Sequence, residues 1–155
     1  MINTVAERNG NICRSPMAEF IFKKIISDRH MSDAFEISSA ATSDEEIWNG
    51  TGNPIYTPAL EQLRRHNIPC DGHRAIQITE RDYDYLVYMD KMNYKNMMRI
   101  IQADPLNKCI RLMDLTERPR DVSDPWYTGN FEKTFTDLNS GCSALADFII
   151  QKIKP

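Results

Sequence analysis

A short segment near the start of the chain has the composition of an anion-binding loop. Residues 9–16 read Asn-Gly-Asn-Ile-Cys-Arg-Ser-Pro. Gly10 and Asn11 tolerate positive φ angles, so successive backbone N–H groups can turn toward one centre. Arg14 and Ser15 stand at the start of a predicted helix, where the helix dipole favours negative charge. We interpret this segment as a candidate phosphate loop; the alternative is an ordinary capped loop with Arg14 in solvent.

The rest of the chain predicts the scaffold that must position this loop. Strand-like segments cover residues 35–39, 84–89 and 108–113, and helical patterns cover residues 16–28, 58–66, 91–103 and 131–154. Strands that alternate with helices predict an α/β fold with a parallel sheet and right-handed crossovers. In such sheets ligands bind at the carboxyl ends of the strands, where a loop leads into a helix. The loop before the first helix is therefore the first place to expect a site.

Length and composition narrow the class of protein. The 155 residues predict one domain over residues 1–155, with a net charge of −3 and no block of like charges. This balance argues against a nucleic-acid binder, which would carry a clustered basic face. We find no signal-peptide pattern, no apolar run of membrane-spanning length and no Cys-x-x-Cys pair, so we expect a cytoplasmic protein with reduced thiols, and no membrane as partner.

Four stretches together resemble the low-molecular-weight protein tyrosine phosphatase family. The sequence GNICRSPMAE resembles that family's C-x5-R-S signature loop. Residues 39–42 (Ser-Ala-Ala-Thr), 89–90 (Met-Asp) and 124–127 (Asp-Pro-Trp-Tyr) recur in the family's order and spacing over nearly the whole chain. The resemblance implies a single doubly wound α/β domain, with a four-stranded parallel sheet flanked by helices and the phosphate loop after strand 1.

The same resemblance implies a mechanism and a set of site residues. A cysteine thiolate attacks phosphorus, and an aspartic acid protonates the leaving phenolate. By resemblance, Arg14 binds phosphate, Ser15 orients the sulfur and Asp124 is the general acid, whereas the plain alternative for Asp124-Pro125 is a turn before the last helix. Ser39 or Ser43 would help Asn11 to hold the loop. The phosphate-binding residues would be Asn9, Gly10, Asn11, Ile12, Cys13, Arg14 and Ser15. The walls of the substrate cleft would be Trp48, Trp126 and Tyr127.

One position departs from the family pattern at its most important point. Counting back from Arg14, the nucleophilic cysteine should be residue 8, which is Arg8. Cys13 cannot replace it, because the residue six positions further on is Glu19 and not arginine; we interpret Cys13 as a packed thiol. Arg8 either adds a second cation to the anion site or points into solvent.

The departure extends over residues 3–8, Asn-Thr-Val-Ala-Glu-Arg, where the family has an apolar buried strand. We therefore expect a disturbed first strand. Two explanations stay open: a misread N-terminal segment of an ordinary phosphatase, or a true pseudophosphatase whose first strand has decayed.

Three functions follow from these observations. The first is a phosphotyrosine monoester hydrolase without metal or organic cofactor, inactive or crippled as long as residue 8 is arginine. The second is a pseudophosphatase that binds phosphate or phosphotyrosine without turnover. Arsenate reductase ranks lower, because it also needs a redox cysteine pair after Asp71, where the sequence has none. The expected partners are a phosphotyrosine-containing protein or a small aryl phosphate, with inorganic phosphate as a competing ligand. Ile12 favours tyrosine over the phosphoarginine branch, which carries threonine there.

Overall fold

A four-stranded parallel sheet lies at the centre of the fold, as the sequence predicts. The computed structural model describes residues 2–5, 14–40, 47–48, 51–52, 57–70, 84–104 and 107–153. The strands of the sheet are β1 (Ile2–Val5), β2 (Ile37–Ala40), β5 (Tyr85–Tyr88) and β6 (Cys109–Arg111), in the order β2-β1-β5-β6. Neighbouring strands are parallel, and Ile2 pairs with Ile37 and with Tyr85. The chain thus has the doubly wound α/β architecture expected from its alternating pattern.

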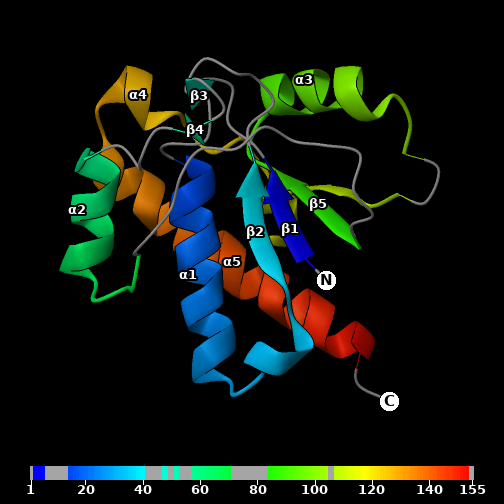
Figure 1. Cartoon of the computed structure of the whole chain (residues 1–155), viewed down its shortest axis with the longest axis horizontal. Coiled ribbons are helices and arrows are strands. Elements are labelled where there is room, and N and C mark those ends of the chain that lie inside the picture. Colours follow the sequence, from blue (N-terminus) through cyan, green and yellow to red (C-terminus); the bar gives the residue numbers. More distant parts are fainter. Residues whose placement is uncertain are drawn as a thin grey trace.

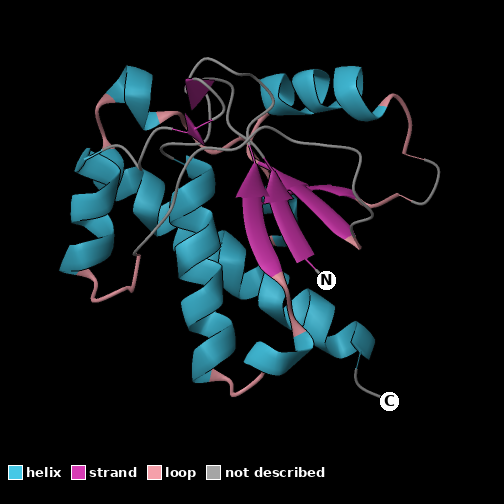
Figure 2. Ribbon diagram, in the orientation of Figure 1, coloured by secondary structure: helices cyan, strands magenta, loops and turns pink. Residues whose placement is uncertain are grey.

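Helices follow the strands (Figures 1 and 2). They are α1 (Arg14–Asp28), α2 (Thr57–Arg65), α3 (Lys91–Ile101), α4 (Pro125–Thr128) and α5 (Phe131–Ile153), with 3₁₀ turns η1 (Ser32–Ala34) and η2 (Leu112–Leu115). In Figure 1, α1 runs beside α5, and α2 packs against both. The arrowheads of the strands in Figure 2 point toward the end of the molecule where α4 and the start of α3 lie.

The core forms mainly between α1 and α5. Apolar side chains on nearly all sides of α1 are buried, because this helix is packed between the sheet, α2 and α5. These are Met17, Ala18, Phe20, Ile21, Phe22 and Ile26, whereas Ile25 is only partly buried. From α5, Leu138, Cys142, Leu145 and Ile149 meet them at helical spacing. The Cys142 thiol lies 3.6 Å from the Ala18 carbonyl oxygen, so the two helices approach closely.

Three local features differ from the expectations. A first strand does form, over Ile2–Val5, and of the polar residues expected to disturb it only Asn3 and Thr4 lie within it; residues 6–8 lie outside the described part of the chain. The segment after Asp124 is not a plain turn but the short helix α4, which Pro125 begins with its preset φ. A separate antiparallel pair, β3 (Ile47–Trp48) and β4 (Thr51–Gly52), was not predicted, because two residues show no periodicity.

Asn67 follows α2 with a left-handed φ of 57°, a conformation that asparagine tolerates and that ends a helix. None of the described helices combines the length and the apolar content needed to cross a bilayer.

Gly141 of α5 gives a test of the packing between this helix and η2. A Cβ atom at position 141 would lie 2.5 Å from Cγ of Leu112, which is fully buried. Overpacking of this kind costs about 1–3 kcal/mol, against a gain of about 1 kcal/mol in helix propensity. We expect Gly141→Ala to lower the free energy of unfolding by about 1 kcal/mol in urea titrations. Ser140→Ala, at the exposed neighbouring position, is the control and should change it by less than ~0.5 kcal/mol. Stabilisation by Gly141→Ala would show that η2 moves aside without cost.

Candidate active site

Arg14 is the buried centre of the candidate site. It is the first residue of α1, and its side chain is 0% exposed. A buried guanidinium is costly unless anions and hydrogen-bond acceptors surround it. The carboxyl ends of the strands and the loops that follow them provide these partners. The position agrees with the sequence-based expectation that Arg14 stands at the start of the first helix.

Asp90, the second residue after β5, holds the guanidinium of Arg14. Its Oδ2 accepts a hydrogen bond from Nη1 of Arg14 at 2.8 Å. Its Oδ1 accepts one from the backbone N–H of Asn93 at 2.8 Å and so caps the N-terminus of α3. One carboxylate thus links the start of α3 to the start of α1.

The segment before α4 supplies the remaining partners that we can describe. Nη1 of Arg14 also donates to the carbonyl oxygen of Val122 at 2.6 Å. The N–H of Val122 donates to the carbonyl oxygen of Met89 at 2.9 Å, which ties this segment to the end of β5. Oδ2 of Asp124 lies 3.8 Å from Nη2 of Arg14, close enough for an ion pair. The carbonyl oxygen of Asp124 accepts from the N–H of Thr128, the first backbone bond of α4.

The geometry brings together two residues 110 positions apart that the sequence suggested for one site. Arg14 is a fixed cation, and Asp124, with a side chain only 10% exposed, is the second carboxylate within ion-pair distance of it in the part of the chain that the structure describes, after Asp90. Because Nη1 serves two protein acceptors, the plane of the guanidinium is fixed. A fixed guanidinium plane is what two-point recognition of a phosphate group requires. The arrangement can therefore bind an anion beside a potential proton donor.

The other expected site residues are described less fully. Ser15 is the second residue of α1, Trp48 lies in β3, and Trp126 and Tyr127 lie in α4; their side chains are outside the described part of the structure. In Figure 1, β3, β4 and α4 lie at the end of the molecule toward which the strands point. Arg8 and the loop residues Asn9, Gly10, Asn11, Ile12 and Cys13 lie outside the described residues, as does Ser43.

Ser39 has a described partner other than the expected one. Its hydroxyl, 2% exposed at the end of β2, donates to Oε1 of Glu19 in α1 at 2.6 Å. Oε2 of Glu19 accepts from Nζ of Lys23 at 2.6 Å. This pairing joins β2 to the first turns of α1. No role for Glu19 follows from the sequence, although this residue belongs to the GNICRSPMAE stretch.

Two of the described cysteines, Cys109 and Cys142, are poorly suited to replace a nucleophile at residue 8 at neutral pH. Burial and the neighbouring Asp104 raise the pKa of the Cys109 thiol to about 12. Burial also raises the pKa of the Cys142 thiol. Among the described residues, no group of three or more His, Cys, Asp or Glu side chains could hold a metal ion.

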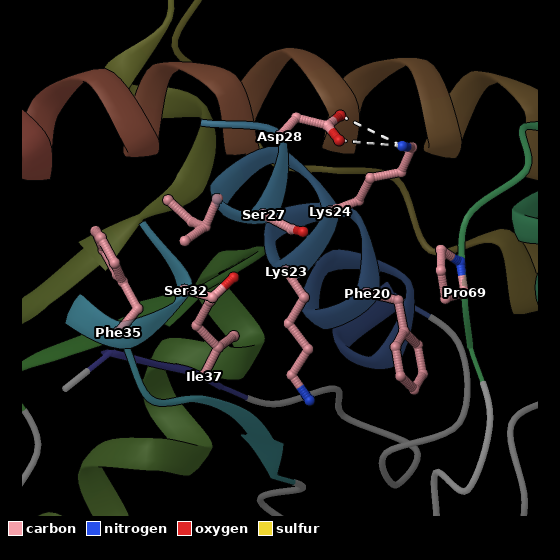
Figure 3. A pocket seen from close by; sticks show the side chains of 10 residues that line it. Phe20, Lys23, Lys24, Ser27, Asp28, Ser32, Phe35, Ile37 and Pro69 are labelled. Atoms are coloured by element: carbon pink, nitrogen blue, oxygen red, sulfur yellow. Dashed lines mark hydrogen bonds and ion pairs between the residues drawn. The ribbon is translucent and has the colours of Figure 1, made fainter. Parts of the chain in front are cut away.

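A separate cavity of about 590 Å³ lies against the outer side of α1 (Figure 3). Phe20, Phe35, Ile37 and Pro69 line it, with Lys24 paired to Asp28 at its rim. Asp28 ends α1 and Ile37 begins β2, so the cavity lies at the opposite ends of these two elements from Arg14. It is therefore separate from the candidate site around Arg14.

Asp90→Asn tests whether Arg14 depends on its carboxylate partner. The substitution keeps an oxygen to cap α3 but removes the charge beside a fully buried guanidinium. We expect the free energy of unfolding to fall by about 2 kcal/mol, less than for a fully buried pair because Asp90 is 19% exposed. Asp114→Asn breaks the exposed pair with Arg111 and should cost less than ~0.5 kcal/mol. Urea titrations compare the two; equal losses would contradict the central role of the Arg14–Asp90 pair.

Comparison with known proteins places this geometry in a family. The family described as low molecular weight phosphotyrosine protein phosphatase matches residues 8–154. The chain is 37% identical over 144 residues to the low molecular weight protein-tyrosine-phosphatase PtpA of Staphylococcus haemolyticus, covering 92% of this chain and 90% of that one.

Solved structures agree with the sequence comparisons. YfkJ from Bacillus subtilis superposes with a TM-score of 0.88 at 33% identity, over 99% of this chain and 98% of that one. SP-PTP, a low molecular weight protein tyrosine phosphatase from Streptococcus pyogenes, superposes with a TM-score of 0.80 at 36% identity, over 99% and 95%. On these matches, the chain belongs to the low molecular weight phosphotyrosine protein phosphatase family.

Proposed function

We propose that the site binds the phosphate group of phosphotyrosine or of a small aryl phosphate, with Arg14 as the phosphate-binding group and Asp124 as the proton donor. The observation that supports this most is the position of Asp124, 3.8 Å from a fully buried Arg14. The N-terminus of α1 adds its dipole at the same place. Inorganic phosphate would compete for the same groups. The names of the relatives, protein-tyrosine phosphatases, support the choice of substrate.

In this proposal, the type of residue 8 decides whether a bound phosphate ester is hydrolysed or only bound. In the family's route a thiolate attacks phosphorus, the bond from phosphorus to the phenolic oxygen breaks, and the acid protonates the leaving oxygen. Water then attacks phosphorus, the sulfur–phosphorus bond breaks, and the same carboxylate takes the proton from water. With Arg8 at the nucleophile's position the first bond cannot form. We infer that this chain retains phosphate monoesters but does not hydrolyse them by the covalent route.

The alternative is an active hydrolase, in which another group attacks phosphorus. The raised pKa values of Cys109 and Cys142 argue against their thiols in this role. Arsenate reduction would need the same missing nucleophile, so it ranks below both the pseudophosphatase and the active hydrolase.

Turnover of p-nitrophenyl phosphate tests the proposal directly. We expect none from the unmodified chain and phosphate-inhibitable turnover from Arg8→Cys, since only the attacking sulfur is then supplied. In that background Asp124→Asn should lower kcat by roughly 10²–10⁴-fold, the usual contribution of a positioned proton donor. Arg118→Cys, which places a thiol at an exposed position, is the control and should stay inactive. Clear turnover by the unmodified chain would overturn the inference about residue 8, and inactivity of Arg8→Cys would count against a site complete except for its thiol.

Alkylation of thiols gives a second test through its pH dependence. The thiolate is the reactive form, and a pKa of about 12 leaves Cys109 almost entirely protonated at neutral pH. Labelling of Cys109 by iodoacetamide should therefore be slow and should rise about tenfold for each pH unit toward alkaline pH. In Arg8→Cys we expect rapid labelling of the new cysteine at neutral pH, slowed by phosphate. Mapping the labelled peptides by mass spectrometry separates the sites. Fast neutral-pH labelling of Cys109 would contradict its half-buried environment beside Asp104.

A further inference from the structure

We propose that Asn93 is a positioning residue that sets the geometry of both Arg14 and the Asp124 segment; this rests on the proposed role of Arg14 in phosphate binding. Asn93 lies in the first turn of α3 and is 0% exposed. Its side-chain Oδ1 accepts a hydrogen bond from the backbone N–H of Met89 at 3.2 Å. Its own backbone N–H donates to Oδ1 of Asp90 at 2.8 Å. Asn93 therefore holds both residues of the turn that follows β5.

Two connections lead from this turn to the candidate site. Through Oδ2, Asp90 accepts from Nη1 of Arg14 at 2.8 Å. Through its carbonyl oxygen, Met89 accepts from the N–H of Val122 at 2.9 Å. Val122 in turn accepts from the same Nη1 of Arg14 at 2.6 Å, so the hydrogen bonds close a ring. Asp124 lies two residues after Val122, and its distance to Arg14 depends on that ring.

The choice of asparagine is not explained by α3 alone. Asparagine is a weaker helix former than alanine, and burial of an amide is costly. Among the described part of the chain, the side-chain nitrogen of Asn93 has no hydrogen-bond partner, which adds to that cost. What the side chain supplies is one uncharged acceptor for the N–H of Met89. Aspartate would also supply an acceptor, but it would add a second negative charge next to Asp90.

Loss of this acceptor should affect groups that Asn93 does not touch. Without it, the N–H of Met89 is left unpaired in a buried place and the turn is free to rotate. Asp90 and the carbonyl oxygen of Met89 then move together, and Arg14 and Val122 follow. A binding group loses much of its affinity when it is held about 1 Å away from its productive position.

The experiment compares Asn93→Ala with Asn93→Asp, which keeps an acceptor, and with Asn96→Ala as the matched control. Asn96 lies on the same helix, partly buried, with only a 3.5 Å contact to Arg99. Two measurements are made on the full chain with Arg8 in place. The first is hydrogen exchange of the Val122 amide, with the NMR signals of the Arg14 guanidinium. The second is the dissociation constant for inorganic phosphate, by calorimetry.

We expect Asn93→Ala to speed exchange of the Val122 amide at least about tenfold, to broaden the Arg14 signals and to raise the phosphate dissociation constant about tenfold. Asn93→Asp should keep the protection of Val122 within about twofold, because the acceptor remains, while its added charge weakens phosphate binding. Asn96→Ala should change none of these quantities. If Asn93 only stabilised the fold, both variants would lower the free energy of unfolding, and exchange of the Val122 amide would not differ between Asn93→Ala and Asn93→Asp.

The two measurements separate failure of this inference from failure of the proposed function. If the unmodified chain does not bind phosphate, the proposed function fails, and the exchange and Arg14 signals still decide the role of Asn93. Unchanged Val122 exchange and Arg14 signals in Asn93→Ala would overturn the inference. If Asn93→Ala does not fold, Asn93→Asp decides: loss of Val122 protection despite the retained acceptor would overturn it equally.

Discussion

The constraint on which the rest of this structure depends is the burial of one guanidinium. Arg14 has no exposed surface, and an isolated charge in such a place would cost several kcal/mol, a large part of the stability of a domain of this size. The chain meets this cost by bringing three segments to one point: the start of α1, the turn after β5 and the segment before α4. Each of them is fixed in turn by backbone hydrogen bonds.

The scaffold explains why these segments meet. In a parallel sheet all strands end at the same edge, so the end of β1 at Val5 and the Met89–Asp90 turn after β5 lie on one side. The long helix α5 covers α1 and also presses on η2, where Gly141 allows Leu112 to approach. Since η2 follows β6 and precedes the Val122 segment, that contact helps to determine where Asp124 arrives. Core packing and site geometry are therefore coupled through η2.

The charge balance at Arg14 bears on what the site does. Asp90 and Asp124 both face the guanidinium, so these three side chains together carry one negative charge when both acids are ionised. Binding of a phosphate group therefore requires additional positive charge near Arg14. The partial positive charge at the N-terminus of α1 provides it. In the proposed function, Arg8 stands where the family has its nucleophile and can attract an anion but cannot attack phosphorus. The proposed separation of binding from turnover follows from that single residue type.

Several features of the protein follow from the sequence by itself. Residues 16–28, 58–66, 91–103 and 131–154 repeat apolar side chains at helical spacing, and the helices form there within a few residues, because local periodicity decides which face is buried. The alternation of these helices with strand-like segments predicted the parallel sheet. The composition of residues 9–16 predicted that Arg14 stands at the start of a helix. The sequence by itself also shows that residue 8 is arginine and not cysteine.

The tertiary structure alone decided which distant groups share the site. The Met89–Asp90 pair matched the family pattern. The neighbouring residues nevertheless gave no sign that Asp90 would form an ion pair with Arg14, 76 positions away. The carbonyl oxygen of Val122 has no signature, since every residue carries the same backbone acceptor. Asn93 looked like an ordinary helix residue until its burial and its bond to Met89 were known. Sequence patterns report which side of an element is apolar, whereas the partners of a buried charge depend on how separate elements pack together.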